Sequence, residues 1–320
     1  MSEEVLKNLD LLALLPCPLK VPVEVEFNNF IEEKKVALNY LLEGNANSQL
    51  NYNDKIEKYE DINEIPEIVI SSGVNSFYYK NFVNKFVDEG YFYDASKDLD
   101  NKFSDCGIKD PDENYTIIAA NILIMVVDLK ALGDLPVPSS WGDLLKPEYY
   151  KKVALRGHDE SFCETTLLTI FKSYGYEGVK EFGKAVKYGW HPSQMVKMAG
   201  SGKEEAPAIS IMPYFFAHIL ESRKDVLIVW PEEGATVSPV TMLVKKSAAE
   251  KLKSTIDFLV GPKLGDICSG AFFPSIHSDS KKVIPETAKL NWIGWDFIKE
   301  RDIGALMEEL NSIFMKAYRG

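Results

Sequence analysis

The feature that most constrains this fold is a repeated order of apolar segment, polar turn and amphipathic segment. LLALL (11–15) precedes an amphipathic stretch that starts at Pro22 and closes at Gly44. EIVIS (67–71) precedes the turn SGVN and a second amphipathic stretch that ends at Gly90. Short apolar runs favour strands and amphipathic runs favour helices, with Pro near a helix start and Gly after its end. Alternating strands and helices predict an α/β fold whose parallel sheet carries helices on its faces.

The same order returns in the second half of the chain. KVALR (152–156) predicts a strand, and the segment 157–175 predicts a helix that Gly175 ends. AISIM (208–212) predicts another strand, followed by a helix that begins near Tyr214. Because single cores usually stop growing at roughly 250 residues, a chain of 320 residues predicts two lobes.

Charge and cysteine spacing exclude several classes of function. The formal net charge is -12 and no basic stripe interleaves with aromatic residues, so we expect no nucleic-acid partner. The four cysteines are far apart in sequence, without the spacing of a zinc or iron-sulfur site. The chain has no G-x-S-x-G, H-E-x-x-H or phosphate-loop motif. We therefore expect no cofactor and no catalysis, while the metal content stays unknown.

The N-terminal residues indicate in which cellular compartment the protein is expected. MSEEVLKNLDLLALLPCP starts with two acids and carries only a short apolar run, which fits neither a signal peptide nor a lipoprotein signal. No apolar run reaches the ~18 residues of a membrane span. The sequence as given predicts a cytoplasmic protein, and removal of a leader would instead place it outside the cytoplasm.

Ligands of open parallel sheets bind beyond the carboxyl ends of the strands, so the strand-to-helix turns are the places to search. Four turns qualify, at residues 16–21, 71–76, 156–162 and 212–215. Two belong to each half of the chain. This distribution predicts one cleft between two lobes.

Several segments resemble a known family in the same order along the chain. WGDLLKPEYYKKVAL (141–155) is similar to the segment that opens the second lobe of bacterial ABC-transporter solute-binding proteins of the iron(III), thiamine and polyamine cluster. The resemblance continues through PAISIMPYFFAHIL, VWPEEGATVSPVTMLVKKSA and FLVGPKLGDICSGAFFPSI, and covers about residues 60–280.

The resemblance implies a two-lobed periplasmic-binding-protein type II fold with two hinge strands, near residues 120–128 and 236–245. It places residues 1–123 and 238–320 in lobe 1 and residues 124–237 in lobe 2. It also implies a monomeric solute-binding protein of an ABC-type uptake system, which captures a small polar or anionic solute or a metal complex by hinge closure. Its ligand is a small molecule or an ion, and whether an ABC permease is a partner stays open.

One departure from the family concerns the ligand. The iron(III) binders of the family carry two adjacent tyrosines at the start of the helix after the AISI strand, because ferric iron favours phenolate oxygen. Here Tyr214 is followed by Phe215. The sequence therefore argues against ferric iron as the native ligand.

In the first lobe, a small polar loop is suited to present hydroxyl groups and backbone amides to an anion. Its candidate ligand-binding residues are Ser71, Ser72, Gly73, Asn75 and Ser76. The alternative role for these residues is simple capping of the following helix. Lys20, in the first strand-to-helix turn, could face an anionic ligand, and the alternative is an ordinary surface lysine.

In the second lobe, His158, Asp159, Glu160 and Ser161 follow the predicted strand and are expected to line the site. The alternative is a solvated loop. Tyr214 matches the first tyrosine of the family pair, and its alternative is a tyrosine of the core. A second hypothesis is a cytosolic enzyme or a metal-dependent sensor that uses His158, Asp159 and Glu160 as metal or acid-base groups in the same cleft.

Overall fold

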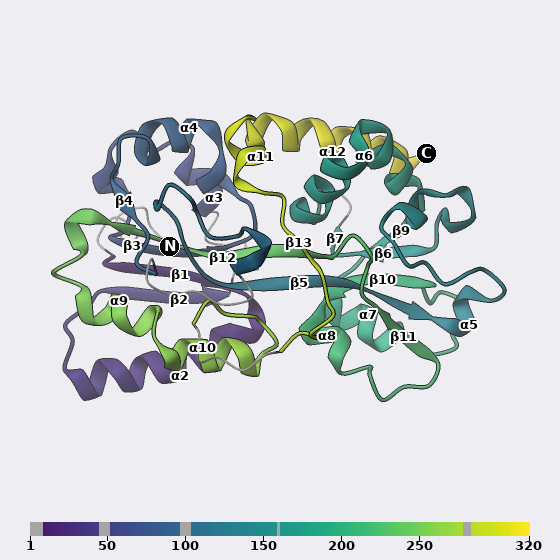
Figure 1. The fold of residues 1–320 in the computed structure, drawn as a ribbon, viewed down its shortest axis with the longest axis horizontal. Coiled ribbons are helices and arrows are strands. Elements are labelled where there is room, and N and C mark those ends of the chain that lie inside the picture. The colour runs from purple at the N-terminus through teal and green to yellow at the C-terminus, as the bar shows by residue number, and fades with distance from the viewer. Residues whose placement is uncertain (1–8, 45–51, 97–103, 159–160, 278–282) are drawn as a thin grey trace. The chain divides into compact units, whose positions relative to one another are not determined.

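Buried apolar strands form the centres of two units in the computed structural model (Figure 1). The structure describes residues 9–44, 52–96, 104–158, 161–277 and 283–320. Unit 1 comprises Met1–Ala120, Pro239–Ile284 and Gly294–Gly304, and unit 2 comprises Asn121–Ser238, Pro285–Ile293 and Ala305–Gly320.

Unit 1 is built on parallel strands that the apolar runs of the sequence predict. Strand β1 pairs in parallel with β2 and with β3, and β12 pairs antiparallel with β3, which gives the order β2-β1-β3-β12. A short strand, β4, pairs with the end of β12. The bounds are Leu11–Leu15 (β1), Tyr40–Gly44 (β2), Ile68–Ser72 (β3), Phe92–Tyr93 (β4) and Ala235–Lys245 (β12). The strands expected at 11–15 and 67–71 are thus confirmed.

Helices cover these strands. Figure 1 shows α2, α9 and α10 on one face and α4 and α11 on the other. The bounds are Cys17–Lys34 (α2), Tyr52–Ile56 (α3), Lys80–Phe82 (α4), Lys253–Leu259 (α9), Pro262–Gly270 (α10) and Trp295–Lys299 (α11). The buried ring of Phe27 in α2 lies edge-on to Phe258 in α9, with ring centroids 5.5 Å apart.

The predicted bounds of the first helix are wrong at both ends. Helix α2 begins at Cys17, so Pro22 lies inside it, and Pro18 occupies the early position that favours proline. The helix ends at Lys34, and the next residue, Lys35, has a left-handed φ of 52° before the chain continues to β2. Because a lysine takes the conformation usually given to glycine, the sequence shows no stop signal before Gly44.

Unit 2 repeats the parallel arrangement. Strands β10 and β9 pair in parallel with β6, while β10 and β11 pair antiparallel with β5. Strand β13 pairs in parallel with the start of β12, and β7 and β8 form a separate hairpin. The bounds are Thr116–Asp128 (β5), Val153–Leu155 (β6), Gly157–His158 (β7), Ser161–Phe162 (β8), Val186–Gly189 (β9), Ile209–Pro213 (β10), Val226–Val229 (β11) and Leu290–Asn291 (β13). Among the described residues, eleven strands belong to the main sheet.

The helices of unit 2 follow its strands as expected, with one difference. Helix α6 does not end at Gly175 but kinks there, where φ is 65°, and continues to Ala185. The bounds are Leu129–Leu132 (α5), Glu164–Ala185 (α6), Pro192–Met198 (α7), Tyr214–His218 (α8) and Ile303–Arg319 (α12). The helix expected near Tyr214 is confirmed.

The C-terminal helix lies in a different unit from the one that the resemblance implies. The resemblance assigns all of residues 238–320 to lobe 1. The structure groups residues 305–320 with unit 2. The reason is the apolar face of α12, where the ring of Phe314 lies 4.8 Å from Phe162 and 5.9 Å from Phe182 between centroids. A side chain at Gly183 would meet the carbonyl oxygen of Phe314 at 2.7 Å, so this glycine lets α6 and α12 approach closely.

Two long strands pass from one unit into the other, at the positions expected for hinge strands. The unit boundary falls between Ala120 and Asn121 in β5 and between Ser238 and Pro239 in β12. Both segments were expected to be extended, which is confirmed. None of the helices that the structure describes combines the length and apolar character that a membrane crossing needs.

The aromatic contact of α12 generates a stability prediction. Phe314 is fully buried. Replacing it with alanine should lower the free energy of unfolding by about 3–5 kcal/mol, because the side chain leaves a cavity. Urea unfolding followed by far-UV circular dichroism measures the change. Ser312→Ala, at an exposed position of the same helix, is the control and should leave the unfolding midpoint nearly unchanged, while equal midpoints for both variants would contradict the packing described here.

Candidate functional site

The polar loop that follows β3 is held by Asn75. Its Nδ2 donates to Ser71 Oγ at 3.0 Å and to the carbonyl oxygen of Ser72 at 3.3 Å. Its Oδ1 accepts a hydrogen bond from the backbone N–H of Phe77 at 3.1 Å, which caps the short 3-10 helix Ser76–Tyr78. Asn75 therefore has the capping role that the sequence offered as an alternative. Whether the loop also contacts a ligand stays a prediction.

Gly73 and Ser76 fix the two sides of the same loop. The N–H of Gly73 donates to the carbonyl oxygen of Pro239 at 2.8 Å, and its φ of 84° is one that glycine adopts readily. Ser76 is buried and its hydroxyl donates to Glu57 Oε1 at 3.3 Å. The five loop residues are thus brought together at the carboxyl end of β3, as predicted.

Lys20 lies inside the first turn of α2 rather than in the connection before it. Its Nζ is 2.9 Å from Glu24 Oε2, one helical turn further along. The hydrogen bond with Glu24 raises the pKa of Lys20. This local ion pair fits the surface-lysine alternative, and a role of Lys20 in ligand binding stays a prediction.

The second-lobe candidates lie on a hairpin rather than at the start of a helix. The backbone of His158 in β7 pairs with that of Ser161 in β8, and α6 begins only at Glu164. The helix expected to open at residue 157 therefore starts later, because 157–162 forms this hairpin. Asp159 and Glu160 lie outside the described residues. In the described part of the chain, no group of three or more His, Cys, Asp and Glu residues is placed to hold a metal ion.

Tyr214 is the first residue of α8, directly after β10. Its hydroxyl donates to Glu221 Oε1 at 2.8 Å, and its ring lies edge-on to Trp230 with centroids 5.0 Å apart. Burial and the hydrogen bond to Glu221 raise the pKa of Tyr214 to about 12. The phenol therefore stays protonated at neutral pH and acts as a hydrogen-bonding group.

A cluster of buried hydroxyl groups lies at the start of α6 and was not predicted from the sequence. Thr165 Oγ1 donates to Ser238 Oγ at 3.4 Å, and both residues are buried. Thr166 is also buried, and its Oγ1 has no hydrogen-bond partner among the described residues. The available signal was the pair Thr165-Thr166 at a helix N-terminus, where a helix favours anions. We name Thr165, Thr166 and Ser238 the α6 hydroxyl cluster.

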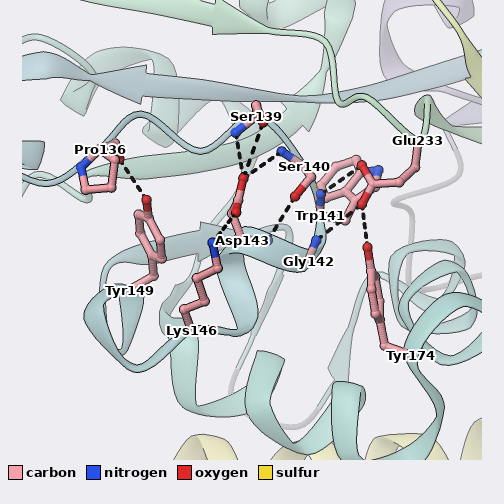
Figure 2. Close-up of polar contacts among 10 residues, drawn as sticks. All are labelled: Pro136, Ser139, Ser140, Trp141, Gly142, Asp143, Lys146, Tyr149, Tyr174 and Glu233. Carbon is pink, nitrogen blue, oxygen red and sulfur yellow. Dashed lines mark hydrogen bonds and ion pairs between the residues drawn. The ribbon is translucent and has the colours of Figure 1, made fainter.

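The WGDLLKPEYY segment has a structural role, which Figure 2 shows. Trp141 is buried and its Nε1 donates to the carbonyl oxygen of Gly234 at 2.9 Å. The carboxylate of Glu233 accepts hydrogen bonds from the backbone N–H of Trp141 at 3.2 Å and of Gly142 at 3.4 Å, and from the hydroxyl of Tyr174. These bonds join residues 141–142, the 231–234 turn and α6 within unit 2.

Asp143 closes the other side of this segment. Its Oδ2 accepts from the backbone N–H of Ser139 at 2.9 Å and of Ser140 at 3.1 Å, and its Oδ1 lies 2.6 Å from Lys146 Nζ (Figure 2). Partial burial raises the pKa of Asp143, but the bonds from Lys146 and the two backbone amides outweigh it and lower the pKa to about 2. The ionised carboxylate of Asp143 therefore holds this segment together through its hydrogen bonds and its ion pair.

Residues 63–301, more than half of the chain, match the family described as bacterial extracellular solute-binding protein. The chain belongs to this family. Its family and fold are those of solute-binding proteins, not of enzymes, so the enzyme alternative is set aside. No curated protein matched the chain.

Solved structures agree with the fold. A periplasmic binding protein, P5PA, is 15% identical with a TM-score of 0.68, over 96% of this chain and 99% of that one. The ferric binding protein from Campylobacter jejuni is 12% identical with a TM-score of 0.66, over 97% and 99%. The Trichodesmium protein IdiA (FutA), solved with iron and citrate ligands, is 12% identical with a TM-score of 0.68, over 97% and 98%. At such identities the likeness confirms the two-lobed periplasmic-binding-protein fold alone.

The carboxylate of Asp143 generates a pH prediction. A carboxyl group whose pKa falls from 3.8 to about 2 on folding contributes stability above pH 4, and this contribution disappears as the pH falls through 2. Asp143→Asn should therefore lower the free energy of unfolding at pH 7 by about 1–2 kcal/mol, with a difference that shrinks between pH 4 and pH 2.

Urea unfolding of wild type and variant across this pH range measures the effect. Glu148→Gln, at an exposed acid in the same segment, is the matched control and should change stability little. A destabilisation by Asp143→Asn that is independent of pH would show that the charge of Asp143 is not what holds the segment.

Proposed function

We propose that this protein is the solute-binding component of an ABC-type uptake system. It captures a small polar or anionic solute, or a metal complex, between two lobes that close about the strands β5 and β12. The observation that carries the proposal is the family match over residues 63–301. In this proposal the protein acts outside the cytoplasm as a monomer and delivers its ligand to a membrane permease.

The proposed ligand contacts come from both lobes. In the first they are the polar loop 71–76 and, less directly, Lys20. In the second they are the hairpin residues His158, Asp159, Glu160 and Ser161, together with Tyr214 and the α6 hydroxyl cluster. A ligand that bridges both sets favours the closed state through its differential affinity, which is how such binding proteins trap solutes.

The donor chemistry favours hydrogen bonding over bare ferric iron. Apart from Lys20, the described candidates are hydroxyl and amide groups, and the hydroxyl of Tyr214 is hydrogen-bonded to Glu221. Phe215 replaces the second tyrosine of the iron(III) binders that the chain resembles. A solute with its own oxyanions, alone or with a metal ion, suits these groups better. The Trichodesmium neighbour, solved with iron and citrate, makes citrate a reasonable first solute to test.

A thermal-shift screen of the full chain tests the proposed function. Citrate, ferric citrate, ferric nitrilotriacetate, phosphate, thiamine and a polyamine cover the relevant chemistries. A ligand at about 100 times its Kd should stabilise the native state by about 2.7 kcal/mol, which is readily visible as a raised Tm. Stabilisation by at least one compound, without its consumption, supports the proposal. A response only to ferric nitrilotriacetate would contradict the preference for oxyanion solutes, and chemical turnover of a compound would contradict a binding role.

Tyr214 gives a sharper test once a ligand is found. Tyr214→Phe should weaken ligand affinity by about 1–2 kcal/mol, because a polar group of the ligand loses its partner, while the free energy of unfolding changes little. Isothermal titration calorimetry measures the affinity. Glu221→Ala removes the same Tyr214–Glu221 hydrogen bond but keeps the phenol, so it is the matched control. If both variants weaken binding equally, the effect comes from loss of the Tyr214–Glu221 hydrogen bond, and Tyr214 does not touch the ligand.

A further inference from the structure

A cavity within unit 2 lies apart from the candidate residues described above. Its volume is about 620 Å³, within the range of roughly 300–1,000 Å³ that is usual for small-molecule sites. The side chains that define its chemistry are Tyr150, Lys151, Lys180, Lys184, Ile313 and Lys316. Lys180 and Lys184 lie near the end of α6, whereas the α6 hydroxyl cluster lies at its start.

The cavity concentrates positive charge in an acidic protein. Four lysines line it, although the chain has a formal net charge of -12. Lys180 and Lys184 form ion pairs with Glu177 at 2.8 Å and Glu181 at 2.5 Å, each one turn away in α6. Such local pairs are weak, and an ammonium group has three donors, so both lysines can still bind an anion.

Lys151 and Lys316 form no ion pair with a carboxylate among the residues that the structure describes. The ammonium group of Lys151 donates to the carbonyl oxygen of Tyr318 instead and lies 5.1 Å from the centroid of the Tyr318 ring. Two of the four lysines therefore reach the cavity without a neutralising partner in the described structure.

The cavity also offers apolar surface. Ile313 and Ala317 of α12 contribute aliphatic groups, and Tyr150 contributes an aromatic ring that lies 5.4 Å from Lys184 Nζ. Ammonium groups next to aromatic and aliphatic surface suit a ligand with an anionic head and an apolar body. A purely inorganic anion would leave the apolar part of the lining unused.

A purely structural explanation covers only part of this arrangement. Lysines near the C-terminal ends of α6 and α12 stabilise the helix dipoles, which needs no ligand. Lys151 belongs to neither helix. It precedes β6 and has a left-handed φ of 56°, and burial lowers its pKa. This backbone conformation belongs to the turn before β6, where the N–H of Lys151 donates to the carbonyl oxygen of Lys184 at 2.9 Å. The helix dipoles therefore do not account for the ammonium group of Lys151 at the cavity.

We propose that this cavity is a second ligand site of the protein, which binds an organic anion composed of a carboxylate or phosphate group and an aromatic or aliphatic body. The site lies within unit 2 alone, so its occupation requires no movement between lobes. It is independent of the proposed solute-binding function, and either can fail without the other.

Isothermal titration calorimetry with defined probes tests the ligand class. 1-Naphthoate and 1-naphthyl phosphate carry both features, acetate and inorganic phosphate lack the apolar body, and 1-naphthalenemethanol lacks the charge. The two complete probes should bind at least about tenfold more tightly than the three incomplete ones, because each incomplete probe forfeits one set of contacts. Equal affinities, or no binding of either complete probe, would overturn the proposal.

Charge reversal locates the site. Lys180→Glu combined with Lys316→Glu should weaken 1-naphthoate binding by about tenfold or more, since both groups line the cavity. The matched control combines Lys203→Glu with Lys224→Glu, two exposed lysines of the same unit outside the cavity lining, and should change affinity by less than about twofold. Equal losses in the two double variants would show that net charge alone governs binding and would overturn the site.

A second variant keeps the test informative if charge reversal disturbs folding. Ile313→Ser removes apolar surface without changing charge, and should weaken 1-naphthoate binding several-fold while far-UV circular dichroism and Tm stay close to wild type. Unchanged binding in this variant would overturn the proposal.

A hexaglutamate peptide tests whether the cavity instead binds an acidic protein segment. Peptide binding that depends on Lys180 and Lys316, without binding of 1-naphthoate, would assign the surface to an acidic protein segment and would overturn the small-ligand site.

Discussion

The complete burial of strand β12 is the constraint on which both units depend. All eleven of its residues are buried, so its polar groups must find partners within the protein. Its first part, up to Ser238, belongs to unit 2, where Ser238 accepts the hydrogen bond of Thr165. Its second part starts at Pro239, whose carbonyl oxygen accepts from the N–H of Gly73 in unit 1. One buried strand thus supplies an anchor for the polar residues of each unit.

The proline at this boundary has a physical consequence. Pro239 has no N–H, so it cannot donate a ladder hydrogen bond at the residue where the chain leaves unit 2, and proline is rare within central strands for this reason. Proline also fixes its own φ near −65° and restricts the preceding residue, Ser238, to extended conformations. Pro239 therefore keeps β12 extended where the chain passes from unit 2 to unit 1.

Much of this fold could be predicted from the sequence because its strands are short apolar runs with polar turns after them. The failures have definite causes. Lys35 takes a left-handed conformation that the sequence does not mark, so α2 was predicted to run through the residues that form β2. The hairpin before α6 is too short for any periodic pattern to be visible in the sequence. The carboxyl-end loops were located by topology alone, which needs only the order of strands and helices.

The candidate site was harder to predict than the fold because its residues do more than one thing. Asn75 looks like a ligand group in sequence and is a helix cap in the structure. Thr165 and Thr166 look like ordinary helix residues and are buried hydroxyls beside Ser238. Both the Nδ2 and the Oδ1 of Asn75 are already hydrogen-bonded within the loop. The buried Oγ1 of Thr166, in contrast, has no partner in the described part of the chain. Since a buried polar group is stabilised only when it is hydrogen-bonded, a bound oxyanion or water at the start of α6 would satisfy this hydroxyl. The physical case for a polar, hydrogen-bonded solute therefore rests more firmly on the α6 hydroxyl cluster, which sequence reasoning missed, than on the loop that it singled out.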